Sequence, residues 1–307
     1  MPTYLGSDGA PLHYEDLHHG TSGDEALPVI ALAGGAARHP SYLGDLAGVG
    51  DRQRLIVPHL RGVASSPMPE SVEAATFWRQ AEDVERLRIH LGLQRVLLLA
   101  HSAGTRLAVS YAAQFPRHLA GMVLITPPAG YLVDEPSDAE ELASRRRGEP
   151  VFDAAMAAWQ AGFNLDDPDA FNAWQQRVAP IGYAAWGARE QAHASAAHYS
   201  LAAARAYFSV DPPPDLAARL GEVKAPVLVV AGAEDCITGL APVAALAELF
   251  QAARAVVIER CGHYPWVEQP AEFRKAVDGF LSTLSLSGSG AQRTNHTPAF
   301  AVGRKLQ

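Results

Sequence analysis

The sequence has few cysteines and no long apolar run, and both absences narrow what the protein can be. Its 307 residues include only Cys236 and Cys261, too few for a scaffold held by disulfides. No apolar stretch approaches the roughly 20 residues that a membrane-spanning helix needs. Residues 1–8 lack the basic start and the apolar segment of a secretory signal peptide. We therefore expect a reducing, cytoplasmic location.

Basic residues are in the minority. Lysine and arginine number 25 against 33 aspartates and glutamates, for a formal net charge of −8. With no basic block in the chain, a nucleic-acid or membrane partner is not expected. There is no G-x-G-x-x-G or P-loop signature, and histidines such as His13, His18 and His193 have no partners at metal-ligand spacing. We expect no metal and no cofactor, and the sequence leaves the oligomeric state open.

What the sequence does contain is an alternation of strand-like and helical runs. Residues 12–18 have the pattern of a half-exposed edge strand. Shorter apolar runs predict buried strands at 28–33, 54–58, 96–99, 122–126, 225–231 and 255–259. Helices are predicted at 73–91, 105–115, 242–250 and 270–284. This alternation indicates an α/β fold with a mostly parallel central sheet and helices on both faces.

The alternation stops between residues 128 and 215, where only alanine-rich helical segments with many aromatics occur. We expect residues 1–127 and 216–284 to form the α/β core and residues 128–215 an inserted helical cap. Tyr183, Trp186 and Tyr207 are candidates for binding substrate there, although packing between helices is the commoner role of such aromatics. Residues 285–307 are rich in serine and glycine and are predicted to be a disordered tail.

The most informative stretch is residues 95–104, an apolar strand that ends in Ala100-His101-Ser102-Ala103-Gly104 just before a helix. This pattern is typical of a nucleophile elbow, the strained turn that presents a serine above a sheet. Ala100 replaces the first glycine of the usual G-x-S-x-G. Small residues are expected at both flanking positions because strand and helix backbones approach closely there. Ser102 is thus the candidate nucleophile, and His101 is expected to pack beneath the turn.

A serine nucleophile needs a base, and the base needs an orienting acid. Asp235 follows the strand at 225–231, and His263 follows the strand at 255–259. Both therefore lie at carboxyl ends of strands, in the order serine, acid, histidine that this kind of site uses. The predicted triad is Ser102, Asp235 and His263, with Glu234 as the competing acid.

Two backbone N–H groups are also expected to form an oxyanion hole. One is that of Ala103, directly after the nucleophile. The other is that of Gly35, in the glycine loop after the strand at 28–33, with Gly34 beside it contacting substrate. Cys236 and Cys261 lie near the predicted acid and base, and they are interpreted as small fillers, with a redox-sensitive pair as the alternative.

With these residues in hand, the chain resembles the α/β-hydrolase superfamily and is most similar to its proline iminopeptidase branch. Residues 33–37, Ala-Gly-Gly-Ala-Ala, stand where that branch has HGGPG, and residues 61–67 resemble its RGxGxSxP stretch. The resemblance implies a serine hydrolase with a helical cap and no cofactor. A cap rich in alanine and aromatics favours a small, mainly apolar substrate or a short peptide.

The chain also departs from that branch. Ala33 replaces a histidine and His59 an aspartate, but neither change removes a backbone donor. The cap glutamates that bind a free amine in these aminopeptidases align with Gly187 and Ala204, so a cationic N-terminus would be buried without a counter-charge. The sequence favours ester or amide hydrolysis through an acyl-enzyme over release of N-terminal proline. Thioesterase, C–C hydrolase and lyase reactions with the same triad remain open, and a non-catalytic binding protein is disfavoured by the intact triad.

Overall fold

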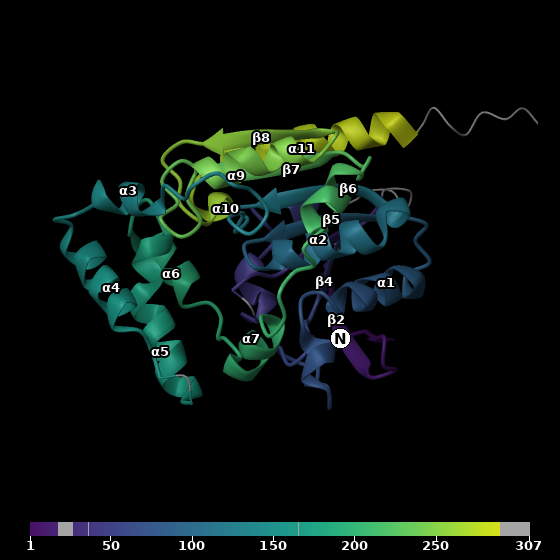
Figure 1. The fold of residues 1–307 in the computed structure, drawn as a ribbon, viewed down its shortest axis with the longest axis horizontal. Coiled ribbons are helices and arrows are strands. Elements are labelled where there is room, and N and C mark those ends of the chain that lie inside the picture. The colour runs from purple at the N-terminus through teal and green to yellow at the C-terminus, as the bar shows by residue number, and fades with distance from the viewer. Residues whose placement is uncertain (18–26, 36, 165, 289–307) are drawn as a thin grey trace, which may run out of the picture.

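An eight-stranded sheet runs through the middle of the computed structural model, which describes residues 1–17, 27–35, 37–164 and 166–288 (Figure 1). The strand order is β1-β2-β4-β3-β5-β6-β7-β8. The strands are β1 (Thr3–Leu5), β2 (Pro11–Leu17), β3 (Val29–Leu32), β4 (Leu55–Pro58), β5 (Val96–His101), β6 (Leu119–Ile125), β7 (Val227–Gly232) and β8 (Ala253–Ile258).

Most of this sheet is parallel, as the sequence predicts. Only β2 runs antiparallel to its neighbours β1 and β4, while the strands from β4 to β8 pair in parallel. Strands β3, β4, β5 and β7 are buried along their whole length. Burial on both faces explains why their sequences are nearly continuous apolar runs. Strand β1 was not predicted.

Helices cover both faces. Leu98 and Met122 pack on one face with Leu107 of α2, in a cluster that also takes in α1, α8 and α9. Their neighbours Leu99 and Val123 face the other way, toward Phe273 of α11 and toward α10. The helices are α1 (Gln80–His90), α2 (Gly104–Gln114), α8 (Leu216–Gly221), α9 (Ala241–Ala245), α10 (Pro265–Glu268) and α11 (Pro270–Gly288). The alternation of side chains along each strand therefore builds two core layers.

Several predicted boundaries differ from the observed ones. The helix expected at 73–91 begins only at Gln80, because Thr76 has an extended backbone and the Phe77 N–H donates to the carbonyl of Tyr207 at 3.1 Å. The helix expected at 242–250 is split into α9 and the 3₁₀ turn η6 (Leu246–Leu249). Helix α11 continues to Gly288, past its expected end at Leu284. The rest of the predicted tail, 289–307, lies outside the described residues, as does His18.

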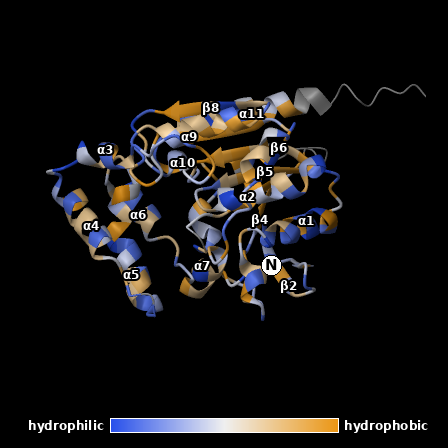
Figure 2. Cartoon of the chain, viewed as in Figure 1, coloured by the Kyte–Doolittle hydropathy of each residue, from blue (hydrophilic) through white to orange (hydrophobic). Residues whose placement is uncertain are grey.

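Between β6 and β7 the described chain contains helices and no strand of the sheet. Residues 139–207, here called the helical segment, lie at the end of the sheet where β5 to β8 terminate (Figure 1). Their own small core includes Phe152, Phe171 and Trp174. Figure 2 shows mixed hydropathy along α4 and α5, in contrast to the apolar strands. The helices are α3 (Ala139–Ser144), α4 (Pro150–Ala161), α5 (Pro168–Val178), α6 (Ala188–Ala194) and α7 (Leu201–Tyr207).

The remaining short elements are 3₁₀ turns, namely η1 (Pro40–Leu43), η2 (Val49–Asp51), η3 (Val72–Ala75), η4 (Pro116–His118) and η5 (Ala179–Gly182). In the part of the chain that the structure describes, no helix is both long enough and apolar enough to cross a membrane.

Candidate active site

The turn after β5 holds Ser102 in an unusual backbone conformation. Strand β5 ends at His101 and α2 begins at Gly104, so the chain passes from strand to helix within two residues. Ser102 has a φ of 50°, a left-handed conformation that costs a residue other than glycine about 1–3 kcal/mol. Its N–H donates to the Ile125 carbonyl at 2.9 Å, which anchors the turn to β6. This is the geometry expected of a nucleophile elbow.

Close packing around the turn explains its small residues. A Cβ on Gly104 would lie 2.5 Å from the carbonyl oxygen of Ala33 and 2.7 Å from that of Leu32. A Cβ on Gly34 would lie 3.0 Å from the Cβ of Ser102. The backbone at the end of β3 therefore leaves no room for a side chain at Gly104, the first residue of α2.

Asp235 and His263 meet at the same edge of the sheet. The loops after β7 and β8 bring Oδ2 of Asp235 to 2.8 Å from Nδ1 of His263, and both residues are buried. Asp235 also accepts hydrogen bonds from the N–H groups of Ile237 and Thr238 and, at 2.6 Å, from the Thr238 hydroxyl. Burial opposes its charge, but the pKa of Asp235 is lowered because His263 and these donors outweigh burial. Glu234 makes no such contact with the imidazole among the described residues.

His101 and Thr126 join the serine turn to the histidine loop. In the ring of His101, Nε2 donates to the His263 carbonyl at 3.0 Å, and Nδ1 accepts from the Tyr42 hydroxyl at 2.8 Å. Thr126 donates to the same carbonyl at 3.0 Å. Burial holds the pKa of His101 well below its usual value. His101 thus packs beneath the turn, as the sequence predicts, and fixes where His263 stands relative to Ser102.

No hydrogen bond joins Ser102 to His263 among the described residues. Catalytic bonds of this kind are often long in unliganded sites and tighten when substrate binds.

The expected oxyanion donors lie on either side of Ser102. Within the described residues, the N–H groups of Gly35 and Ala103 donate to no other protein group. The N–H of Gly34, by contrast, donates to the Tyr42 hydroxyl at 2.6 Å. Gly35 has a φ of 68°, and a Cβ there would lie 2.7 Å from the Tyr199 ring. Two free donors and a conformation that only glycine adopts easily fit the predicted role of this loop.

The three aromatic residues predicted to bind substrate occupy different environments. Tyr183 lines a pocket. Trp186 instead packs on the ring of Tyr183 at 5.3 Å between centroids and does not line that pocket. Tyr207 is only 1% exposed and donates its hydroxyl to the Ala103 carbonyl at 2.8 Å. The structure thus corrects the prediction for Tyr207, which buttresses the serine turn from within the core.

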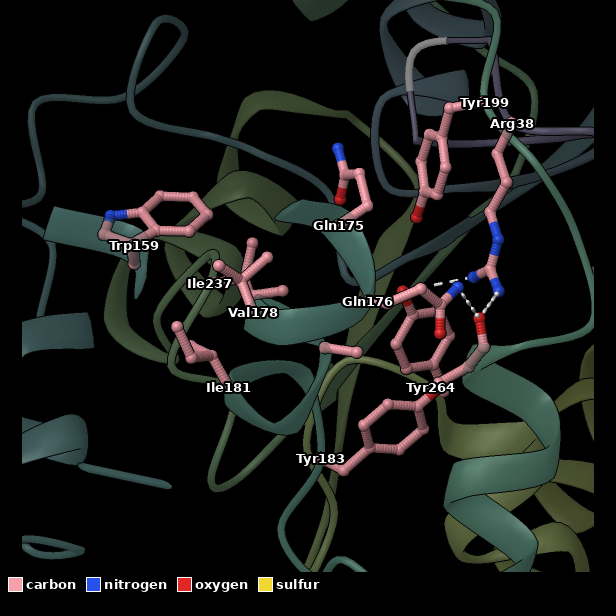
Figure 3. A pocket seen from close by; sticks show the side chains of 12 residues that line it. Arg38, Trp159, Gln175, Gln176, Val178, Ile181, Tyr183, Tyr199, Ile237 and Tyr264 are labelled. Carbon is pink, nitrogen blue, oxygen red and sulfur yellow. Dashed lines mark hydrogen bonds between the residues drawn. The ribbon is translucent and has the colours of Figure 1, made fainter. Parts of the chain in front are cut away.

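The pocket has a volume of about 60 Å³ and so exceeds the roughly 10–15 Å³ that one water molecule requires. Arg38, Ile237 and Tyr264 contribute to it from the loops after β3, β7 and β8 (Figure 3). The rest of its wall comes from the helical segment and adjoining turns. Because Ile237 and Tyr264 follow Asp235 and His263 closely in the chain, the pocket adjoins the candidate site.

Sequence reasoning missed four residues that shape this region, namely Arg38, Tyr42, Tyr199 and Glu268. Glu268 is buried and accepts hydrogen bonds from the N–H groups of Gly262, at 3.0 Å, and Ala184, at 2.7 Å. It thereby ties the histidine loop to the helical segment. Arg38 follows the glycine loop directly, and that proximity is the one signal the sequence offered. Each of the other three has at least one partner far away in the chain, namely His101 for Tyr42, Arg38 for Tyr199 and Ala184 for Glu268.

The histidines and cysteines considered as metal ligands or as a redox pair form no comparable site among the described residues. Among the described residues, no group of three or more His, Cys, Asp or Glu side chains is arranged to hold a metal ion. Cys236 and Cys261 are free thiols. Burial raises the pKa of Cys236 to about 11 and also raises that of Cys261, so neither is a reactive thiolate at neutral pH.

Comparisons with known proteins agree with this geometry. Residues 27–270 match the family model of the alpha/beta hydrolase fold. The chain is similar to 2-hydroxy-6-oxo-6-phenylhexa-2,4-dienoate hydrolase of Comamonas testosteroni, at 27% identity over 66% of this chain and 68% of that protein.

Two solved structures are similar in fold. Esterase RhEst1 from Rhodococcus sp. ECU1013 matches with a TM-score of 0.68 at 24% identity, covering 92% of this chain and 98% of that one. A proline iminopeptidase of Mycobacterium smegmatis matches with a TM-score of 0.69 at 21% identity, covering 94% and 99%.

Proposed function

Since this chain belongs to the α/β-hydrolase fold family, we propose that it is a serine hydrolase that cleaves an ester or amide bond of a small, mainly apolar substrate. The observation that carries the proposal is the hydrogen-bonded pair of Asp235 and His263, placed at the same sheet edge as the strained turn of Ser102. The resemblance to α/β hydrolases expected from the sequence is confirmed, and one similar protein is by name a hydrolase.

In the proposed mechanism, the Ser102 hydroxyl attacks the substrate carbonyl and passes its proton to Nε2 of His263. Asp235 accepts the hydrogen bond from Nδ1, which holds the imidazole in the required tautomer and stabilises its positive charge. The N–H groups of Gly35 and Ala103 stabilise the oxyanion of the tetrahedral intermediate. His263 returns the proton to the leaving group, and water then releases the acid from the acyl-enzyme.

A C–C bond is the second candidate target. The relative from Comamonas testosteroni is by name a dienoate hydrolase. The proposed serine, histidine and aspartate suit either bond, because the fold family hosts many chemistries.

Release of N-terminal proline is disfavoured by charge. Arg38 lines the pocket next to the candidate site, so a substrate ammonium group would meet a fixed positive charge. Gly187 and Ala204, at the positions aligned with amine-binding glutamates, carry no counter-charge. Nearby Glu190 is occupied with the Gly187 N–H at 2.9 Å.

The decisive experiment is Ser102→Ala. We expect kcat for p-nitrophenyl ester hydrolysis to fall at least about 10⁴-fold, and fluorophosphonate labelling to disappear, because the nucleophile is gone. Ser195→Ala, an exposed serine on the helical segment, is the matched control and keeps both. Labelling that persists in Ser102→Ala would refute the proposal. A prolyl arylamide assayed beside the esters separates the aminopeptidase alternative.

A further inference from the structure

We propose that Arg38 forms a carboxylate-binding subsite, so that the substrate of the proposed hydrolase carries a carboxylate group as well as the bond that is cleaved. The inference rests on the proposed function and narrows its substrate class from mainly apolar to apolar with one anionic group.

Arg38 is a buried cation with an unused donor. Its side chain is 2% exposed, and its guanidinium stays protonated at any physiological pH. One terminal nitrogen donates to the carbonyl oxygens of His193 and Ala194, each at 3.0 Å, and the other reaches the Tyr264 hydroxyl at a long 3.4 Å. Its Nε is buried without any hydrogen-bond partner. A buried donor left unpaired costs free energy that a ligand would recover.

No described carboxylate neutralises Arg38. The groups around the guanidinium are aromatic rings, with the Tyr42 centroid at 4.4 Å, Tyr199 at 5.4 Å and Tyr264 at 5.9 Å. The pKa of nearby His193 is lowered to about 4, first by burial and then by the charge of Arg38. The positive charge is therefore felt locally and is not cancelled by a neighbouring side chain.

A second buried arginine in the same chain shows what full compensation looks like. Arg61 is 1% exposed and lies in the core. It forms ion pairs at 2.7 Å with both Asp8 and Asp83. Since burying an unpaired charge is costly, the contrast implies that Arg38 obtains its anion from outside the chain.

Two further donors, the side chains of Tyr199 and Gln175, line the same pocket as Arg38. Figure 3 shows Arg38 beside Tyr199 at one end and Trp159 at the other. Among the described residues, neither the Tyr199 hydroxyl nor the Gln175 amide makes a hydrogen bond, and both side chains line the pocket. Trp159, at the far end, is 48% exposed. The pocket thus leads from an accessible apolar rim to the buried Arg38 and two half-buried donors, a set that suits a carboxylate.

The contacts of Arg38 with His193 and Ala194 also stabilise the C-terminal end of α6, and this is the structural role against which the proposal is tested. A structural role alone predicts equal losses for charged and neutral substrates. A carboxylate subsite predicts a selective loss.

The experiment compares two matched ester pairs. With the carboxylate on the acyl side, mono-p-nitrophenyl glutarate is compared with p-nitrophenyl hexanoate. With it on the leaving group, 4-acetoxybenzoate is compared with 4-methylphenyl acetate. We expect at least one pair to show a ratio of kcat/KM, charged over neutral, that falls about 10- to 100-fold in Arg38→Gln. Arg145→Gln, which replaces an exposed arginine of the helical segment, should keep the wild-type ratio. Ratios unchanged by Arg38→Gln in both pairs would overturn the proposal.

Binding separates this inference from the proposed function. In the Ser102→Ala background, calorimetry with glutarate should show affinity at least about 10-fold higher than with neutral glutaramide, and Arg38→Gln should abolish the difference. Glutarate selectivity without any ester hydrolysis would uphold the subsite and refute the hydrolase. Ester hydrolysis by the wild type without selectivity for glutarate would refute the subsite and uphold the hydrolase. If Arg38→Gln fails to fold, the comparison of glutarate with glutaramide in Ser102→Ala alone decides the matter.

Discussion

The sheet and the helical segment differ in how much of each is buried in a packed core. Strands β3, β4, β5 and β7 are buried along their whole length, and helices pack on both faces of the sheet. The helical segment has only a small core of its own, and Trp159 on α4 is about half exposed. The proposed reacting groups extend from the sheet, whereas the pocket lies where the two regions meet. In the proposed function, bond cleavage therefore depends on groups held by the densely packed sheet, while substrate selectivity depends on the boundary between the two regions.

The largest effect on activity is expected from a substitution among the proposed catalytic residues that extend from the sheet. Asp235→Asn leaves the loop in place but favours the wrong imidazole tautomer, so kcat for an ester should fall about 10³- to 10⁴-fold. Steady-state kinetics would measure it. Glu234→Gln, at the neighbouring acid, should change kcat little. The reverse order of the two effects would move the acid of the site to Glu234.

A second change tests whether the helical segment unfolds on its own. Trp174 packs against Trp159, with ring centroids 5.4 Å apart, and against Phe163 at 4.6 Å. Trp174→Ala should lower the local stability of the helical segment by about 3–5 kcal/mol. Amide hydrogen exchange should then accelerate in residues 139–207, while β5 and β6 stay protected.

Leu107→Ala, in the core layer on α2, is the matched control for that experiment. It should accelerate exchange in the sheet as well, because Leu107 packs on its strands. Uniform acceleration in Trp174→Ala would mean that the two regions form one cooperative unit.

The smallest effect concerns the link between the regions. Burial raises the pKa of Glu268 to about 7 against the backbone donors that lower it. The folded protein therefore holds the Glu268 proton more tightly than the unfolded chain does, so the contribution of this group to stability is greatest at low pH and falls as pH rises from about 4.5 to about 7. The loss attributable to this group is about 3 kcal/mol.

Glu268→Gln removes the titrating group and gives the measurement its reference. The free energy of unfolding of wild type and of Glu268→Gln is measured by urea denaturation at pH 5 and at pH 8. Relative to the variant, the wild type should be more stable at pH 5 than at pH 8 by about 3 kcal/mol. The exposed Glu272→Gln on α11 should show no such pH dependence. A constant difference for Glu268→Gln would contradict the raised pKa.

Residue patterns predicted most of the fold but few of the residues that line the pocket. Alternation located the half-exposed strand β2, and apolar runs located the strands from β3 to β8. Burial on both faces explains the apolar runs of β3, β4, β5 and β7. The start of α1 was misplaced because Phe77 follows a contact with Tyr207 from a distant part of the chain. Tyr207 was likewise predicted to bind substrate, because the local sequence around an aromatic residue in a helix does not show whether its side chain faces a cavity or the core.

The order of elements and the chemistry at strand ends were determined by the sequence alone, since short-range patterns and motif spacing suffice to place a serine, an aspartate and a histidine on successive loops. Only the tertiary structure decided which charges are compensated. Arg61 and Arg38 look alike in the printed chain, yet one meets two carboxylates and the other meets none among the described residues. The physical reason is that burial and counter-charge are properties of contacts between distant segments, and local sequence does not encode them.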